Sequence, residues 1–200
     1  MPAAAATAES TLASRALAAP PWCGTPEADW SGDLPNGSNP GDPPGSFPHI
    51  PYYAIGCTLA DMQARSNGRM QVNDLGDSAG GRDRYLVVLN ALDTPQQRKD
   101  WQTWQNIRKI ALTDPARAQA MLDKAGDVKI PLFIQSGIHG TESEGVDAMF
   151  EVMERLATTP YGADPEVDAV LDHVILLWNP VHNPDGRVIG QRGNVNNFDL

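Results

Sequence analysis

Long hydrophobic runs and clusters of basic residues are both missing from this sequence. No run of 18 apolar residues occurs in its 200 residues, so a membrane-spanning helix is not expected. Lysine and arginine total 15 against 25 acidic residues, which gives a formal net charge of −10 at pH 7. An acidic chain without a basic cluster is a poor partner for nucleic acid or for an anionic membrane. We therefore expect neither partner.

Cysteine is also scarce, with Cys23 and Cys57 the two examples in the sequence. Such a pair is either a disulfide in an exported protein or two inert thiols in a cytosolic one. Residues 19–53 are rich in Pro, Gly, Asn and Asp and have little regular structure of their own, which favours a bridge. In the chain-entropy model this bridge would stabilise the fold by about 3–4 kcal/mol. The cysteines thus indicate a secreted or extracytoplasmic protein.

The first 19 residues carry no clear targeting signal. They lack a basic region, and their alanine-rich apolar stretch is interrupted by Glu9 and Ser10. A pro-region, the end of an export signal and a disordered leader are all compatible with this composition. We expect residues 1–53 to be a leader and a Pro/Gly-rich arm, largely irregular. Residues 54–200, with ordinary hydrophobic content, are expected to form one folded region.

Hydrophobic periodicity in the folded region predicts both strands and helices. Two β-rich runs at 69–76 and 84–91, with glycines between them, predict a hairpin. A buried strand at 129–136, a helix at 143–158 and a buried strand at 173–180 follow a βαβ order, which implies parallel strands. The other expected helices are 56–67, 95–125 with a second start at Asp114-Pro115, and 164–171. The sequence therefore predicts an α/β fold, with a mixed parallel and antiparallel central sheet and flanking helices.

A G-x-S-x-G pattern around Ser78 suggests a serine nucleophile at first sight. The nucleophile elbow of α/β-hydrolases requires a strand, a sharp turn and then a helix. The segment after Ser78 is RYLVVLN, which is rich in β-forming residues. Ser78 is therefore expected in a hairpin loop, where the glycines serve the turn, and a serine hydrolase is the weaker alternative.

His139 and Glu142 follow the predicted strand 129–136 and precede a predicted helix. Ligands bind at the carboxyl ends of parallel strands, and an i, i+3 pair at a helix start can point an imidazole and a carboxylate at one position. Two His and one Glu are a known catalytic zinc set, with the fourth position left for water. The alternative is structural, with Glu142 or Glu144 complementing the helix dipole. Spacing alone does not decide between these interpretations.

A second polar cluster follows the predicted strand 173–180. Residues 183–186, NPDG, predict a turn. Arg192 then lies in a Gly- and Asn-rich loop of low apolar content, which is either disordered or positions polar groups at a site. His182 is a rival metal ligand, although no other His or carboxylate lies at ligand spacing from it.

These motifs together resemble the zinc carboxypeptidase family, typified by carboxypeptidase A. They are HGTE at 139–142, NPDG at 183–186, the arginine at 192 and FDL at 198–200. The segment DLGDSAGGRDRYLVVL also resembles an early hairpin of that family, in which a G-x-S-x-x-G-R pattern links two strands. The resemblance runs from about residue 52 to residue 200.

The resemblance implies a function and a set of site residues. His139 and Glu142 would be ligands of one Zn²⁺ ion, and Arg192 would polarise the scissile carbonyl and stabilise the oxyanion. The substrate would be the C-terminus of a peptide or protein. Thr141 stands where some animal members have an arginine, so the subsite contacts of that arginine are not implied here.

The family pattern continues beyond the motifs present in this sequence. The segment like FDL is followed in the family by Asn-Arg, which hold the terminal carboxylate of the substrate. A third zinc ligand and a glutamate general base come later. We therefore expect residues 54–200 to be the N-terminal part of a catalytic domain, truncated at the C-terminus and inactive alone. A peptidase-like domain that binds peptides without cleaving them is the non-enzymatic alternative.

Overall fold

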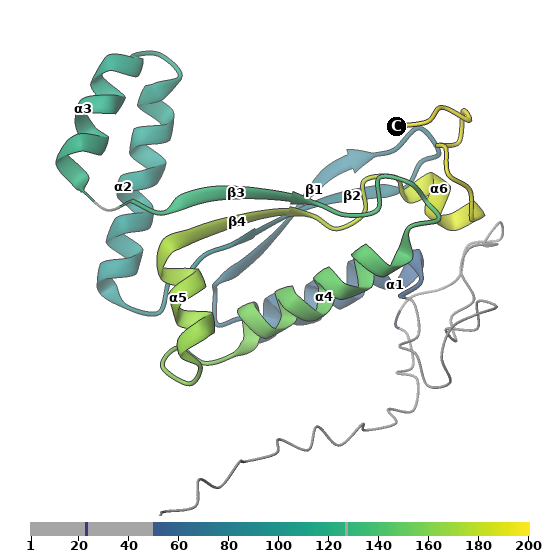
Figure 1. The fold of residues 1–200 in the computed structure, drawn as a ribbon, viewed down its shortest axis with the longest axis horizontal. Helices are drawn as coiled ribbons and strands as arrows, with labels where there is room; N and C mark the ends of the chain where they lie inside the picture. The colour runs from purple at the N-terminus through teal and green to yellow at the C-terminus, as the bar shows by residue number, and fades with distance from the viewer. Residues whose placement is uncertain (1–22, 24–49, 127) are drawn as a thin grey trace, which may run out of the picture.

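The fold is organised around a sheet with the strand order β1-β2-β4-β3 (Figure 1). The computed structural model describes Cys23 and residues 50–126 and 128–200, and the sheet is that of these residues. Its strands are β1 (Met70–Asp77), β2 (Asp83–Leu89), β3 (Ile130–Gln135) and β4 (Val174–Asn179). β2 pairs antiparallel with both β1 and β4, and β3 pairs parallel with β4. The predicted mixed sheet and its hairpin are confirmed.

Helices cover one face of the sheet and extend from both of its ends. The helices in the described residues are α1 (Tyr52–Arg65), α2 (Pro95–Ala111), α3 (Pro115–Ala125), α4 (Ser143–Thr158), α5 (Pro165–His173) and α6 (Pro184–Ile189). α1 and α4 lie side by side along one face, the α2–α3 hairpin stands at one end, and α6 lies at the other (Figure 1). In the described part of the chain, none of these helices is long and apolar enough to cross a bilayer.

Local capping explains where several helices begin. The Thr94 side chain accepts a hydrogen bond from the Gln97 backbone N–H, and the Gln97 side chain completes the capping box at the start of α2. Asp114 caps α3 in a similar way and is followed by proline, so the predicted start at Asp114-Pro115 is confirmed. α1 begins at Tyr52, which is four residues earlier than predicted.

The main hydrophobic core lies between the sheet and the α1–α4 layer. Ile55, Leu59 and Met62 of α1 are buried, as their helical spacing predicts. Trp178 of β4 is fully buried and meets Phe150 of α4 edge to face, with ring centroids 4.8 Å apart. This packing fixes α4 against the two parallel strands.

The strand β3 is much more exposed than its sequence predicts. Ile130, Leu132 and Phe133 are 68%, 47% and 55% exposed. β3 is last in the strand order, so in the described chain it has one neighbour, β4. The prediction of a buried strand is therefore wrong for β3. It is right for β4, where Ile175, Leu176 and Trp178 are buried.

The α2 helix buries few of its apolar side chains. Ile107 is buried, and Trp101 stacks on Trp104 with 5.3 Å between ring centroids. Leu112 is 85% exposed because it lies just past the end of the helix. The two tryptophans therefore stack on each other, and the Arg108 guanidinium lies over the Trp104 ring.

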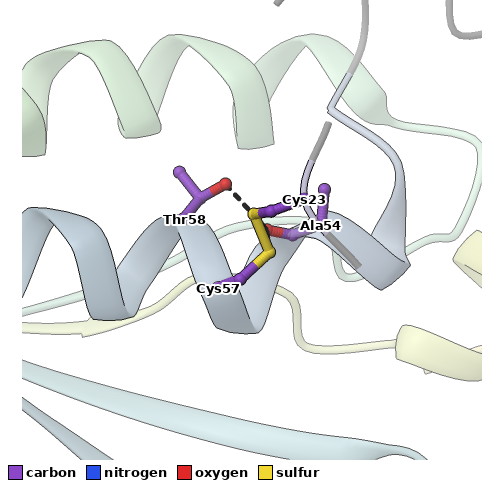
Figure 2. Close-up of a disulfide and its surroundings, with 4 residues drawn as sticks. All are labelled: Cys23, Ala54, Cys57 and Thr58. Carbon is purple, nitrogen blue, oxygen red and sulfur yellow. Dashed lines mark hydrogen bonds between the residues drawn. A yellow bond between two sulfur atoms is a disulfide. The ribbon is translucent and has the colours of Figure 1, made fainter. Parts of the chain in front are cut away.

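A disulfide joins Cys23 to Cys57, which confirms the predicted bridge (Figure 2). Cys57 lies within α1, where the neighbouring Thr58 hydroxyl donates a hydrogen bond to the Ala54 carbonyl, 2.7 Å away. The bridge spans 34 residues and attaches the chain near Cys23 to the helix layer. The rest of the predicted leader and arm, up to residue 49, lies outside the described residues.

Candidate metal and substrate site

The two polar loops predicted after β3 and β4 are joined to each other by backbone hydrogen bonds. The Ser136 N–H donates to the Asn179 carbonyl at 3.0 Å, and the His182 N–H donates back to the Ser136 carbonyl at 2.9 Å. The Asn183 N–H then donates to the Gly137 carbonyl at 3.0 Å. The parallel pairing of β3 and β4 thus continues beyond the strand ends. It brings both loops to the carboxyl edge of the sheet, where α/β folds bind ligands.

His139 and Glu142 face each other at this edge. The His139 Nδ1 atom lies 2.5 Å from Glu142 Oε1, and the Glu142 N–H donates to the His139 carbonyl at 3.1 Å. Glu142 is the N-cap residue of α4, but its side chain makes no capping hydrogen bond. Its contact with the imidazole lowers the pKa of Glu142, and burial opposes this effect. The structure therefore places the Glu142 carboxylate on the imidazole rather than on the helix end.

Asp199 joins this pair and was not predicted as a site residue. Its Oδ1 lies 3.1 Å from His139 Nε2, and its Oδ2 accepts a hydrogen bond from Arg192 Nε at 3.0 Å. The hydrogen bond from Arg192 is the main cause of the lowered pKa of Asp199. The four side chains therefore form a continuous line, Glu142–His139–Asp199–Arg192. Asp199 lies in the FDL motif, which was the available sequence signal.

The loop that carries Arg192 is tied to α6. The Asn183 side chain donates to the Arg192 carbonyl at 3.3 Å, and the Gln191 N–H donates to the Gly186 carbonyl at 3.0 Å. NPDG was predicted to be a turn, but Asn183 is the N-cap of α6 and the other three residues form its first turn, with the Asn183 side chain accepting a hydrogen bond from the Gly186 N–H. A helix starts here because Asn is a favoured N-cap residue and Pro is favoured at the first helical position.

Ser78 and His182, the two rival site residues, have other surroundings. Ser78 is in the β1–β2 loop, as predicted, and its hydroxyl donates to Asp185 at 2.7 Å. Within the described residues, no histidine forms a hydrogen bond with Ser78. The His182 ring lies 3.4 Å from the Asn179 side chain, and burial is the main cause of its lowered pKa. Neither residue forms a hydrogen bond or an ion pair with His139 or Glu142 in the described part of the chain.

Comparison with known proteins identifies the family to which this chain belongs. The sequence model of the zinc carboxypeptidase family matches residues 56–198, which is most of the chain. The chain belongs to the zinc carboxypeptidase family. The resemblance carried by HGTE, NPDG, Arg192 and FDL is therefore confirmed at the level of the family.

Two individual proteins illustrate the similarity in sequence and in fold. Carboxypeptidase 2 of Trichophyton tonsurans is 24% identical over 162 residues, covering 78% of this chain and 28% of its own length. A metallo-carboxypeptidase from Burkholderia cenocepacia has a similar fold, with a TM-score of 0.53 and 22% identity. That match covers 76% of this chain and 32% of the Burkholderia chain. The chain thus spans about a third of the length of its relatives.

The donor atoms at His139 and Glu142 suit the metal of a zinc carboxypeptidase. An imidazole nitrogen and a carboxylate oxygen are two of the donor types in catalytic zinc sites with two His and one Glu. Over the described ranges, no three His, Cys, Asp or Glu side chains are grouped to hold a metal ion. His139 and Glu142 therefore bring together two of the donor types that such a zinc site uses.

Proposed function

We propose that this chain supplies part of the active site of a zinc-dependent metallocarboxypeptidase, which hydrolyses C-terminal peptide bonds of peptides or proteins. One observation carries the proposal: the continuous line Glu142–His139–Asp199–Arg192 at the carboxyl edge of the sheet. It contains two metal-ligand types, a carboxylate that orients the histidine, and a cation.

The contacts of His139 orient its ring toward Glu142. Asp199 contacts His139 Nε2, which leaves Nδ1 facing Glu142. A carboxylate on the second ring nitrogen fixes the tautomer and the ring orientation of a metal-bound histidine. His139 and Glu142 would hold one Zn²⁺ ion, and zinc in such sites polarises a carbonyl and lowers the pKa of bound water towards about 7.

Arg192 is the proposed oxyanion-stabilising residue. Its side chain is 59% exposed, and its Nε atom donates to Asp199. The guanidinium has further donors besides Nε. These donors can face a substrate carbonyl while Asp199 holds the side chain in place. A cation that is held in this way stabilises developing negative charge without having to reorganise.

The other parts of the proposed active site would come from residues outside 1–200. These parts are the third zinc ligand, the general base and the clamp for the substrate carboxylate. The position of β3 is compatible with this proposal, because a further strand paired parallel to β3 would end at the carboxyl edge next to His139. The disulfide supports an extracytoplasmic location for the whole protein.

The 200-residue chain alone is expected to be inactive. Two protein ligands bind zinc weakly, and no general base is proposed within the chain. The measurement is hydrolysis of an N-blocked dipeptide with a free C-terminus in the presence of added Zn²⁺. Zinc-dependent turnover by this chain would contradict the proposed division of the site.

Replacing Glu142 with glutamine is expected to weaken zinc binding by the chain at least about tenfold. Glutamine keeps the shape of glutamate but lacks its negative charge. Isothermal titration with zinc chloride would measure the affinity. Glu144→Gln is the matched control, since Glu144 is an exposed acid in the first turn of α4 and is not proposed as a ligand. Equal affinities for the wild type and Glu142→Gln would overturn the proposed metal site.

A further inference from the structure

The β1–β2 loop binds a buried carboxylate that the proposed chemistry does not use. Asp185 of α6 is 3% exposed. Its Oδ1 accepts hydrogen bonds from the Ser78 hydroxyl at 2.7 Å and from Arg82 Nη1 at 3.0 Å. Its Oδ2 accepts a hydrogen bond from the Gly80 backbone N–H at 3.0 Å. One short loop thus supplies three donors to one carboxylate.

The loop is itself held in shape by internal hydrogen bonds. The Ser78 N–H donates to the Arg82 carbonyl at 2.8 Å, and the Gly81 N–H donates to the Ser78 carbonyl at 3.0 Å. The Arg82 N–H donates to the Ser78 hydroxyl oxygen at 3.0 Å. The Ser78 hydroxyl therefore accepts from the loop and donates to Asp185, so it connects the two elements.

α6 contacts both halves of the candidate site. On one side it meets the loop of residues 136–142, which carries His139 and Glu142 and is called the zinc-pair loop below. The contact is so close that a Cβ atom on Gly140 would overlap the Gly186 carbonyl. On the other side, Asn183 holds the Arg192 carbonyl. A shift of α6 would therefore change the separation between His139 and the Arg192–Asp199 pair.

We propose that Ser78, Gly80 and Arg82 form a clamp on Asp185 that positions α6, and through α6 sets the spacing between the zinc pair and Arg192. In this proposal Ser78, Arg82 and Asp185 are positioning residues, because their hydrogen bonds act on α6. This inference rests on the proposed function for its meaning, although the clamp itself can be tested without metal. It also gives the G-x-S-x-G segment a role other than that of a nucleophile.

Trypsin cleavage of the metal-free chain tests the clamp directly. Ser78→Ala removes the hydroxyl, and Gly80→Ala places a Cβ atom where it would overlap the Asp185 carboxylate. Both variants are expected to raise the rate of cleavage after Arg192. For Ser78→Ala we expect about a tenfold increase, the factor that corresponds to losing one hydrogen bond to a charged group. Ser78→Thr keeps the hydroxyl and is expected to restore the slow rate. Mass spectrometry would identify each cut.

Cleavage after Arg117, on the distant helix α3, is the internal reference. Loss of overall stability would raise cleavage at both arginines, whereas a displaced α6 would raise it after Arg192 alone. Gly145→Ala is the control for added volume, because no atom lies within 4 Å of its new Cβ. Equal rates at Arg192 in Ser78→Ala and the wild type, or equal increases at both arginines, would overturn the clamp. If Gly80→Ala does not fold, the Ser78→Ala and Ser78→Thr pair decides.

Zinc affinity of the same variants links the clamp to the site. Ser78→Ala is expected to weaken zinc binding severalfold, because Asp199 withdraws from His139 as the Arg192 loop moves, and Ser78→Thr is expected to restore it. Unchanged zinc affinity in Ser78→Ala, when Glu142→Gln does weaken binding, would refute the link while leaving the proposed function intact. Unchanged affinity in Glu142→Gln would instead refute the proposed function, and the trypsin result would still judge the clamp.

Discussion

Replacing Gly140 with alanine is expected to destabilise the fold by about 3 kcal/mol, at the upper end of the usual cost of overpacking. The added Cβ would overlap the carbonyl group of Gly186 and the backbone nitrogen of Arg187. These are backbone atoms of α6 and cannot rotate away as a flexible side chain can. The zinc-pair loop and α6 would have to separate, so zinc affinity is expected to fall together with stability.

Urea unfolding followed by tryptophan fluorescence would measure the effect of Gly140→Ala. Gly145→Ala, five residues further on in α4, is the matched control, because its Cβ meets open space and alanine favours a helix over glycine. A Gly140→Ala variant as stable as the wild type would show that α6 and the zinc-pair loop are not in the close contact described above.

Replacing Trp178 with alanine is expected to cost about 3–5 kcal/mol, the usual range for removing a buried aromatic side chain. The ring is fully buried and packs edge to face against Phe150. Its indole N–H donates to the Ser136 hydroxyl at 3.1 Å. Ser136 begins the zinc-pair loop, which leads to His139. The substitution therefore removes core volume and also a hydrogen bond that supports this loop.

Trp178→Phe separates these two contributions. Phenylalanine keeps much of the apolar volume but lacks the indole N–H, so a smaller loss of about 1–2 kcal/mol is expected. Calorimetric unfolding of the three proteins would rank them as wild type, Trp178→Phe and Trp178→Ala. Equal stability of the two variants would mean that the hydrogen bond to Ser136 matters more than the filled volume.

Patterns that depend on local chemistry predicted the fold well. Asp114-Pro115 contains its own helix-start signal, and the glycines between the β-rich runs indicate a hairpin, so both features are found in the structure. The exposure of β3 depends on which elements lie beside it, which its own apolar run does not encode. One local signal was available, because Pro131 has no backbone N–H and prolines in sheets favour edge strands.

The candidate site was predictable to a similar extent. His139 and Glu142 lie three residues apart at a helix start, so their proximity follows from local geometry. Asp199 reaches His139 across sixty residues of chain, and a lone aspartate in a short motif does not indicate its partner. Ser78 was correctly placed in a hairpin loop by the β-forming residues that follow it. Its contact with Asp185 could not be predicted, since it depends on how α6 packs.

The position of β3 has a consequence for the colloidal behaviour of the isolated chain. An exposed strand edge with Ile130, Leu132 and Phe133 along it is a template for intermolecular pairing. Repulsion between copies with a net charge of −10 opposes that pairing at pH 7. Salt screens this repulsion within about 10 Å at 0.1 M ionic strength, and acidification towards the isoelectric point near 4.7 removes it. The chain is thus best kept in dilute, neutral, low-salt solution, where charge keeps the open strand edges of different molecules apart.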